Sequence, residues 1–237
     1  CEWGCFDYSQ QEPRLVVHYA SLDQDTSVFD VKEAYEDGDA DFHTIVAKMA
    51  DIPRSAAKTI NLGLFYGMGK AKLQAELGVS KDKAEELFSI YHSRVPFVKS
   101  LTKSVSNRAQ QRGQIRTLLG RLCRFHLWEP NTFGMHKALP FEQAVQEHGP
   151  GIKRAYTYKA LNKLIQGSAA DMTKKSMLDL YKEGIVAHIQ IHDELDVSVE
   201  SPEQAKKIVE IMENAVKLEI PNKVDYESGK NWGTIND

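Results

Sequence analysis

The sequence has few cysteines and no long hydrophobic run. Its 237 residues include three cysteines, Cys1, Cys5 and Cys123, which cannot all pair with one another and show no CxxC spacing. This pattern predicts a reducing compartment, with neither a disulfide framework nor a cysteine zinc site. No apolar run approaches the roughly 18 residues of a membrane span, and no signal peptide is recognisable. We therefore expect a cytoplasmic protein without a membrane partner.

A strong charge bias is also lacking. The chain has 30 basic and 33 acidic residues, which gives a formal net charge of −3. Such a balance neither requires nor excludes a nucleic-acid partner, because binding then depends on how the charges are distributed. The hydrophobic fraction of 42% suffices for one core or for two closely packed subdomains.

The first half of the chain has one short strand pattern followed by helical patterns. Residues 2–7 are rich in aromatic side chains and predict a strand that ends at Asp7. Ser9 and Glu12 have the spacing of a capping box, which predicts that a helix begins there. Further helices are expected over residues 26–36, 41–50, 53–66, about fifteen residues after Ser80, and from Pro96 onward.

The second half returns to strands. It predicts a hairpin over 114–125, an irregular surface insertion over 126–150, a helix over 151–183 ending at Gly184, strands over 185–191 and 194–200, a helix over 202–218 and a strand over 223–226. The pattern is typical of an α+β fold, in which a small antiparallel sheet is interrupted by a large helical insertion.

Two acidic residues stand at predicted strand ends. Asp7 ends the first strand, and Asp193 lies in the turn between the strands 185–191 and 194–200. Either residue alone is more often structural, because Asp is common before helix caps and in turns. Two carboxylates that meet at neighbouring strand ends repel each other, and hard oxygen ligands favour Mg²⁺. Two such cations can stabilise the attacking and leaving oxygens of a phosphoryl displacement.

A stripe of four residues follows one face of the predicted helix 53–66. Arg54, Lys58, Leu62 and Tyr66 are spaced four residues apart, so they form a slowly turning row. Two cations, an apolar side chain and an aromatic ring suit a nucleoside triphosphate, with the cations at the phosphates. The alternative is an ordinary amphipathic helix with solvated basic side chains, and spacing alone favours that alternative.

Four segments taken together carry a family resemblance. Residues 7–14 (DYSQQEPR) resemble motif A of family A DNA polymerases (DYSQIELR), and residues 54–68 resemble motif B (RRxxKxxNFGxxYG). Residues 166–171 (QGSAAD) are similar to the family's QGTAAD segment, and residues 192–194 (HDE) resemble motif C. The order and spacing agree over nearly the whole chain, which makes the combined match specific.

The resemblance implies template-directed DNA synthesis with two Mg²⁺ ions, for which Mn²⁺ is an expected substitute. Asp7 and Asp193 are expected to hold the metals, with Glu194 near the primer end and Lys58 as a proton donor to pyrophosphate. DNA contacts are implied for Asn162, Gln166 and His192, largely in the minor groove. Contacts with the incoming dNTP are implied for Gln10, Glu12, His43, Arg54, Lys58, Leu62 and Tyr66. Glu12 is expected to reject ribonucleotides by crowding the 2′ position of the sugar.

The resemblance also divides the chain. It implies palm over 1–25, fingers and insertion over 26–150, and palm over 151–237, with the thumb and any exonuclease absent. We therefore expect a C-terminal portion of a longer or split polymerase. Its expected partners are primer–template DNA, dNTPs, an N-terminal segment carrying the thumb, and a processivity factor. Leu62 replaces an aromatic residue of motif B, as in some phage members, so a phage origin and the host cytoplasm are expected.

Other readings remain open. A polymerase-like nucleic-acid-binding subunit without catalysis is one, although both metal acids and both motif B cations are present. A single-subunit RNA polymerase or a reverse transcriptase is another. Glu12 and the segment 166–171 favour synthesis of DNA on a DNA template.

Overall fold

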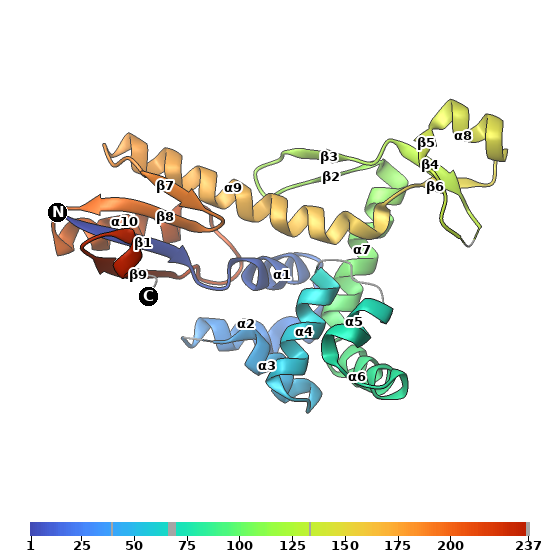
Figure 1. Ribbon diagram of the computed structural model, residues 1–237, viewed down its shortest axis with the longest axis horizontal. Helices are drawn as coiled ribbons and strands as arrows, with labels where there is room; N and C mark the ends of the chain where they lie inside the picture. The colour runs from blue at the N-terminus through green and yellow to red at the C-terminus, as the bar shows by residue number, and fades with distance from the viewer. Residues whose placement is uncertain (39, 66–69, 133, 236–237) are drawn as a thin grey trace. The chain divides into compact units, whose positions relative to one another are not determined.

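The computed structural model describes residues 1–38, 40–65, 70–132 and 134–235. The chain forms two compact units, one of Cys1–Ile45 with Gln166–Asp237 and the other of Val46–Ile165. Helices and small antiparallel sheets together confirm the predicted α+β class (Figure 1). Among the helices within these described ranges, none is both long and apolar enough to cross a membrane.

The first unit is built on a four-stranded antiparallel sheet. Its strands are β1 (Glu2–Tyr8), β7 (Ile189–Ile191), β8 (Glu194–Val199) and β9 (Val224–Gly229), in the order β7-β8-β1-β9. The amino-terminal strand therefore lies between two strands from the end of the chain (Figure 1). This arrangement brings residues nearly 190 positions apart into direct register, such as Asp7 opposite Glu194.

The two faces of this sheet differ in chemistry, because successive side chains of a strand point to opposite sides. One face contains Phe6 and Tyr8 of β1 with Leu195 and Val197 of β8, and these side chains are buried. Gly4 shares this face, where an added Cβ would lie 2.6 Å from a methyl group of Val199. The opposite face carries Cys5, Asp7, Glu194, Asp196, Asp225 and Glu227. The sequence therefore builds one apolar and one acidic face.

Helical segments complete the first unit, and two of them contact the apolar face through Tyr8. The helical segments are α1 (Gln11–Leu22), η1 (Thr26–Val28), α2 (Phe29–Glu36), α3 (Phe42–Ala50), which continues into the second unit, α9 (Ala160–Lys182), which enters from it, α10 (Pro202–Asn214) and η3 (Trp232–Thr234). The Tyr8 hydroxyl hydrogen-bonds with Ser176 of α9 and donates to the Met212 carbonyl of α10. These contacts fix the end of β1, directly after Asp7.

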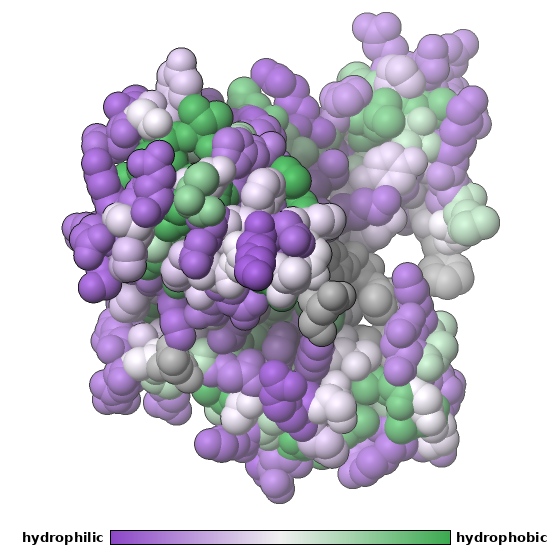
Figure 2. All heavy atoms as spheres, turned by 60° about the vertical axis from the view of Figure 1, so that its left-hand side comes forward, coloured by the Kyte–Doolittle hydropathy of each residue, from purple (hydrophilic) through white to green (hydrophobic). Residues whose placement is uncertain are grey.

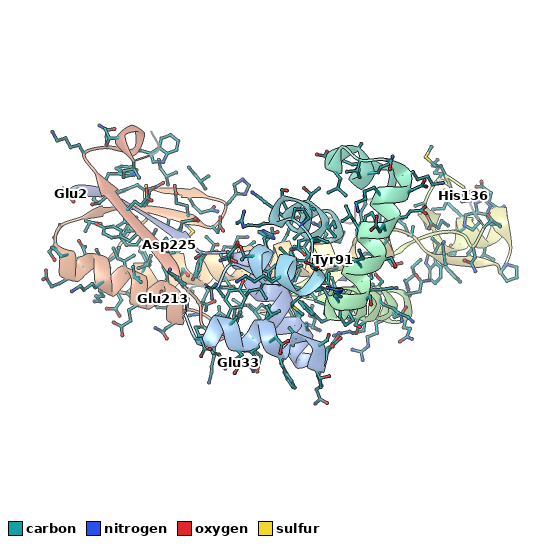
Figure 3. All side chains as sticks on the ribbon, turned by 90° about the horizontal axis from the view of Figure 1, so that it is seen from below. Glu2, Glu33, Tyr91, His136, Glu213 and Asp225 are labelled. Carbon is teal, nitrogen blue, oxygen red and sulfur yellow. The ribbon has the colours of Figure 1, made fainter. Side chains whose placement is uncertain are left out.

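The second unit begins with helices. They are α4 (Arg54–Phe65), α5 (Lys70–Leu77), α6 (Lys81–Arg94) and α7 (Pro96–Arg112). Ser80 caps α6 by accepting from the Lys83 amide, as predicted, and Pro96 opens α7. Tyr91 of α6 lies among the helices of this unit (Figure 3). Its hydroxyl donates to the Asn61 side-chain oxygen, and both residues are fully buried. This bond joins α6 to the middle of α4.

The remainder of the second unit is a hairpin and a small sheet with one helix. These elements are β2 (Gln114–Arg116), β3 (Leu122–Arg124), β4 (Leu127–Pro130), β5 (Leu139–Pro140), α8 (Phe141–His148), β6 (Ile152–Arg154) and η2 (Thr157–Lys159). The predicted hairpin is confirmed, but the prediction that 126–150 is irregular is wrong. The Arg154 guanidinium packs 4.4 Å from the Trp128 ring and donates to the Gln110 and Phe125 carbonyls. Such long-range contacts order a segment whose proline and glycine content suggests a loop.

Three further boundary predictions are wrong. Gln10, not Ser9, is the N-cap of α1, and no side chain caps that helix. The helix expected over 151–183 begins only at Ala160, because residues 152–154 pair with β4. The strand expected over 185–191 is limited to Ile189–Ile191.

In the view of Figure 2, mostly hydrophilic residues cover the surface with apolar patches between them, which is ordinary for a folded domain.

Candidate active site

The two predicted metal acids lie at neighbouring strand ends in the first unit. Asp7 is the penultimate residue of β1 and pairs in register with Glu194, the first residue of β8. Asp193 immediately precedes Glu194 in the turn from β7, and its carbonyl accepts a bond of 3.4 Å from the Tyr8 amide. The fold thus brings Asp7, Asp193 and Glu194 together at one edge of the acidic face.

Residues in a left-handed backbone conformation flank both acids. His192 has φ 52° at the first position of the two-residue turn, and Gln10 has φ 53° where β1 leads into α1. Glycine normally occupies such positions, and other residues there cost about 1–3 kcal/mol. In the His192 turn, the Gln190 side chain donates to the His192 carbonyl at 2.6 Å. The strained turns are therefore held by specific contacts beside the acids.

Gln10 links the end of β1 to the start of α3. Its side-chain oxygen accepts from the Tyr35 hydroxyl at 3.0 Å and from the Phe42 amide at 2.8 Å. Its side-chain nitrogen donates to the Ala40 carbonyl at 2.8 Å. The amide predicted to contact a nucleotide is thus engaged in three bonds within the protein, which fix the segment preceding His43.

The electrostatics of this edge favour protonation of the acids. Burial, then the charges of Asp193, Glu194 and Asp225, raise the pKa of Asp7 to about 7. Burial likewise raises the pKa of Asp193, and burial together with Asp196 raises the pKa of Glu194. Within the described ranges, neither Asp7 nor Asp193 forms an ion pair with a Lys or Arg. A cation bound here would relieve this repulsion.

The donor set at this edge fits a divalent cation. After burial, the negative charge of Asp193 is the largest contribution to the raised pKa of Asp7. Oxygen atoms from paired carboxylates are the ligands that Mg²⁺ and Mn²⁺ prefer. The repulsion between the Asp7 and Asp193 carboxylates, which a cation would neutralise, is therefore the structural observation that supports a metal centre.

Two further residues on the same face were missed by sequence reasoning. Asp196 is fully buried, and its Oδ1 accepts from the Cys5 thiol at 2.8 Å and from the Trp3 indole at 3.2 Å. Burial and Asp196 raise the pKa of the Cys5 thiol to about 12. Asp196 follows Glu194 by two residues, so the period of a strand already places both on one face. That signal is present in the sequence.

The predicted motif B residues lie on α4 in the second unit. Arg54 is the first residue of this helix, Lys58 is also exposed, and Leu62 is half-buried. Ala57, Ile60 and Asn61 of the same helix are buried, so α4 is amphipathic. Tyr66 lies outside the described residues. The stripe therefore has two cations beside a helix N-terminus, where backbone amides also favour an anion.

The other predicted residues lie on three segments. Glu12 is in the first turn of α1, and His43 is half-buried on α3 beside Phe42. Asn162 and the exposed Gln166 are one helical turn apart on α9. His192 is exposed in the turn that carries Asp193.

Comparison with known proteins gives a consistent result. The model of DNA polymerase family A matches residues 2–234. A DNA-directed DNA polymerase of Pseudomonas phage M6 is 34% identical over 98% of this chain and 38% of its own length. DNA polymerase I of Bacillus caldotenax is 31% identical over 98% of this chain and 26% of its own length. The chain thus spans well under half of these curated relatives.

A solved structure agrees with these relatives. The polymerase domain of Pol1 from M. smegmatis, in complex with DNA primer–template and dNTP, has 28% sequence identity and a TM-score of 0.77. The match covers 100% of this chain and 41% of that one.

Proposed function

Because the chain belongs to DNA polymerase family A, we propose that it carries out template-directed DNA synthesis as the palm and fingers portion of a polymerase. In this reaction a primer 3′-hydroxyl attacks the α-phosphate of a dNTP, and pyrophosphate leaves. The observation that carries the proposal is the meeting of Asp7, Asp193 and Glu194 at adjacent strand ends, with no basic partner for the two aspartates among the described residues.

Asp7 and Asp193 are the residues that would hold the metal. Two Mg²⁺ ions bound there would activate the primer hydroxyl and stabilise the leaving pyrophosphate. The protein's own contribution is to hold the Asp7 and Asp193 carboxylates in position. Tyr8 anchors β1 to α9 and α10, and the His192 turn presents Asp193 beside it. Groups held in place by the fold need no reorganisation during the reaction.

The basic end of α4 is proposed to bind the triphosphate. Arg54 and Lys58 supply positive charge, and Lys58 is the proposed proton donor to pyrophosphate. Leu62 and Tyr66 are proposed to pack near the sugar and base. Glu12 is proposed to exclude ribonucleotides, while the Gln10 side chain positions the segment that leads to His43.

The partners follow from this role. Asn162, Gln166 and His192 are proposed to contact primer–template DNA, and the M. smegmatis domain of similar fold is bound to such DNA. An N-terminal segment with the thumb is the proposed protein partner. The division into palm (1–25 and 151–237) and fingers (26–150) is part of the proposal, as is a phage-type origin, which the phage relatives support.

The test is primer extension by the purified chain on a primed DNA template. We expect incorporation that requires Mg²⁺ or Mn²⁺, stops with EDTA, prefers dNTPs to rNTPs and disappears in Asp193→Ala. The assay is repeated after adding, as a recombinant protein, the part of the phage M6 relative that this chain does not match, because the proposed thumb would lie there.

The alternatives give different outcomes. Template binding without incorporation, both with and without the added segment, would identify a non-catalytic binding subunit. Preference for rNTPs would indicate an RNA polymerase, and synthesis only on an RNA template would indicate a reverse transcriptase. Glu12→Ala separates these further, because it should relax the preference for dNTPs without abolishing synthesis.

A further inference from the structure

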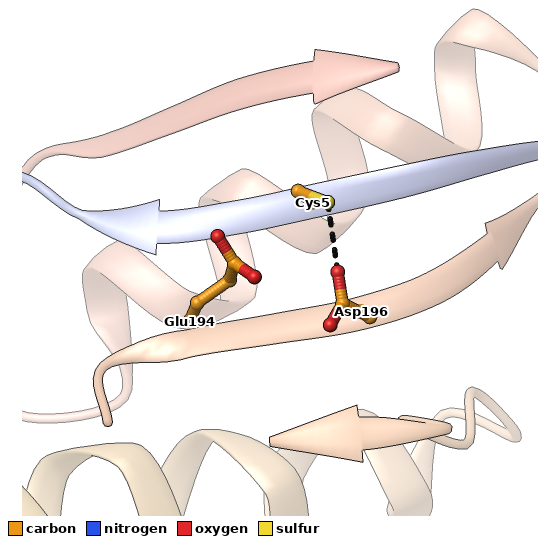
Figure 4. Close-up of side chains that lie close together, drawn as sticks. All are labelled: Cys5, Glu194 and Asp196. Carbon is orange, nitrogen blue, oxygen red and sulfur yellow. Dashed lines mark hydrogen bonds between the residues drawn. The ribbon is translucent and has the colours of Figure 1, made fainter. Parts of the chain in front are cut away.

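A second group of potential ligands lies on the acidic face beside the aspartate pair. One ligand atom from each of Cys5, Glu194 and Asp196 lies within 4.8 Å of the others. Cys5 and Asp196 face each other in register across β1 and β8, and Glu194 is two residues from Asp196 on the same side (Figure 4). A thiol and two carboxylates therefore converge on one point between two strands.

The burial of Asp196 points to a missing partner. The residue is fully buried, and its Oδ2 has no hydrogen-bond partner, although Oδ1 accepts from Trp3 and Cys5. Asp196 and Glu194 also form no ion pair with Lys or Arg in the described part of the chain. An isolated buried carboxylate oxygen is costly, and buried charges in proteins are normally paired or coordinate a metal.

The arrangement has the geometry of a mixed sulfur–oxygen site after a small adjustment. The Cys5 thiol donates to Asp196 Oδ1, with the sulfur and oxygen 2.8 Å apart. In a tetrahedral zinc site the corresponding sulfur and oxygen would be roughly 3.5 Å apart. A cation can therefore take the place of the thiol proton if Cys5 and Asp196 separate by less than about 1 Å and Glu194 moves closer, which leaves a fourth position for water.

We propose that Cys5, Glu194 and Asp196 form a binding site for a thiophilic divalent cation such as Zn²⁺, next to the Asp7–Asp193 centre and with Glu194 between the two. Binding breaks the Cys5 S–H bond, releases its proton to the buffer, and forms a sulfur–metal bond. The freed Asp196 carboxylate and Glu194 supply oxygen ligands. This assignment does not depend on polymerase activity. The sequence pattern predicts no cysteine zinc site because the partners of Cys5 come from a distant strand rather than from a CxxC spacing.

The test uses Co²⁺ as a spectroscopic stand-in for Zn²⁺. In a Cys1→Ser, Cys123→Ser background, Cys5 is the single thiol, so any thiolate-to-metal charge-transfer absorbance reports on it. We expect saturation at about one equivalent of Co²⁺ and displacement by Zn²⁺. The same absorbance should persist in Asp193→Asn, which alters the other centre. It should disappear in Cys5→Ser and require at least about tenfold more Co²⁺ in Asp196→Asn.

Absence of the absorbance in the folded background protein, or its persistence in Cys5→Ser, would overturn the proposal. A second measurement needs no change at Cys5. Zn²⁺ should protect Cys5 in the background protein from alkylation by iodoacetamide under mild urea, whereas Mg²⁺ should not. Equal alkylation rates with and without Zn²⁺ would also overturn the assignment.

Discussion

The sheet of the first unit and residues 96–163 of the second carry opposite charges. The sheet gathers acidic side chains on one face, whereas residues 96–163 contain twelve Lys and Arg against three acidic residues. The rest of the chain has 18 basic and 30 acidic residues. The net charge of −3 is therefore the sum of two opposed regions. The acidic face of the sheet is suited to bind cations, and residues 96–163 are suited to bind an anionic partner.

The largest effect should follow from removing an acid at the strand ends. Asp7→Ala is expected to lower the rate of primer extension by at least about 10²-fold, the loss typical of removing one electrostatic stabiliser. Glu200→Gln is the matched control, because Glu200 is exposed and lies just beyond the far end of β8. Single-turnover extension measures both variants. Equal losses in the two would show that overall acidity, rather than the strand-end position, matters.

The next largest effect is expected for nucleotide selection at the proposed nucleotide site on α4. Leu62 is half-buried on α4, in line with Lys58. Leu62→Phe is expected to change the ratio of dideoxynucleotide to dNTP use by about tenfold, which is within the range of one altered apolar contact. Competition extension assays measure the ratio. Identical ratios in wild type and Leu62→Phe would remove Leu62 from the proposed nucleotide site.

A smaller effect, on DNA binding, should distinguish residues 96–163 from the rest of the chain. Lys159, the last residue of η2, lies 5.3 Å and 5.6 Å from the exposed rings of Tyr156 and Tyr158, and Lys163 is exposed in the first turn of α9. Lys159→Ala with Lys163→Ala should weaken duplex binding. It should also reduce the slope of log K against log salt by about 0.9 for each phosphate that the variant no longer neutralises. Fluorescence anisotropy over a salt series measures the slope.

Lys182→Ala is the control for that experiment. Lys182 is at the other end of the same helix and pairs with Asp179 at 3.4 Å. It should leave the salt slope unchanged. A similar change in both variants would mean that DNA binding is not concentrated in residues 96–163.

Local and long-range features differ in how far the sequence predicts them. Asp7, Asp193 and Glu194 lie at predicted strand ends, and the family resemblance of their segments predicts one site for them. The Cys5–Asp196 contact and the small sheet of β4, β5 and β6 depend on pairing between distant residues. Arg154 shows why, because its partners Gln110, Phe125 and Trp128 give no local signal. Local periodicity predicts elements, whereas these contacts arise only in the folded chain.

The smallest expected effect is the pH dependence of stability in the metal-free protein. The pKa of Asp7 is raised to about 7 from an ordinary value near 3.8, chiefly by burial and by Asp193. Between these two values the folded state holds a proton that the unfolded state has lost. The free energy of unfolding should therefore fall as pH rises from about 4 to about 7, and this contribution should level off above that range.

Asp7→Asn should make this decline shallower without abolishing it, because the pKa values of Asp193 and Glu194 are also raised. Urea unfolding in EDTA at several pH values measures the slope, with Glu200→Gln as control. Adding Mg²⁺ at about pH 8 should stabilise the wild type more than Asp7→Asn, since a ligand that binds only the folded state adds stability. Parallel pH curves for wild type and Asp7→Asn, with equal Mg²⁺ responses, would mean that a raised pKa of Asp7 is not the cause of the pH dependence of stability.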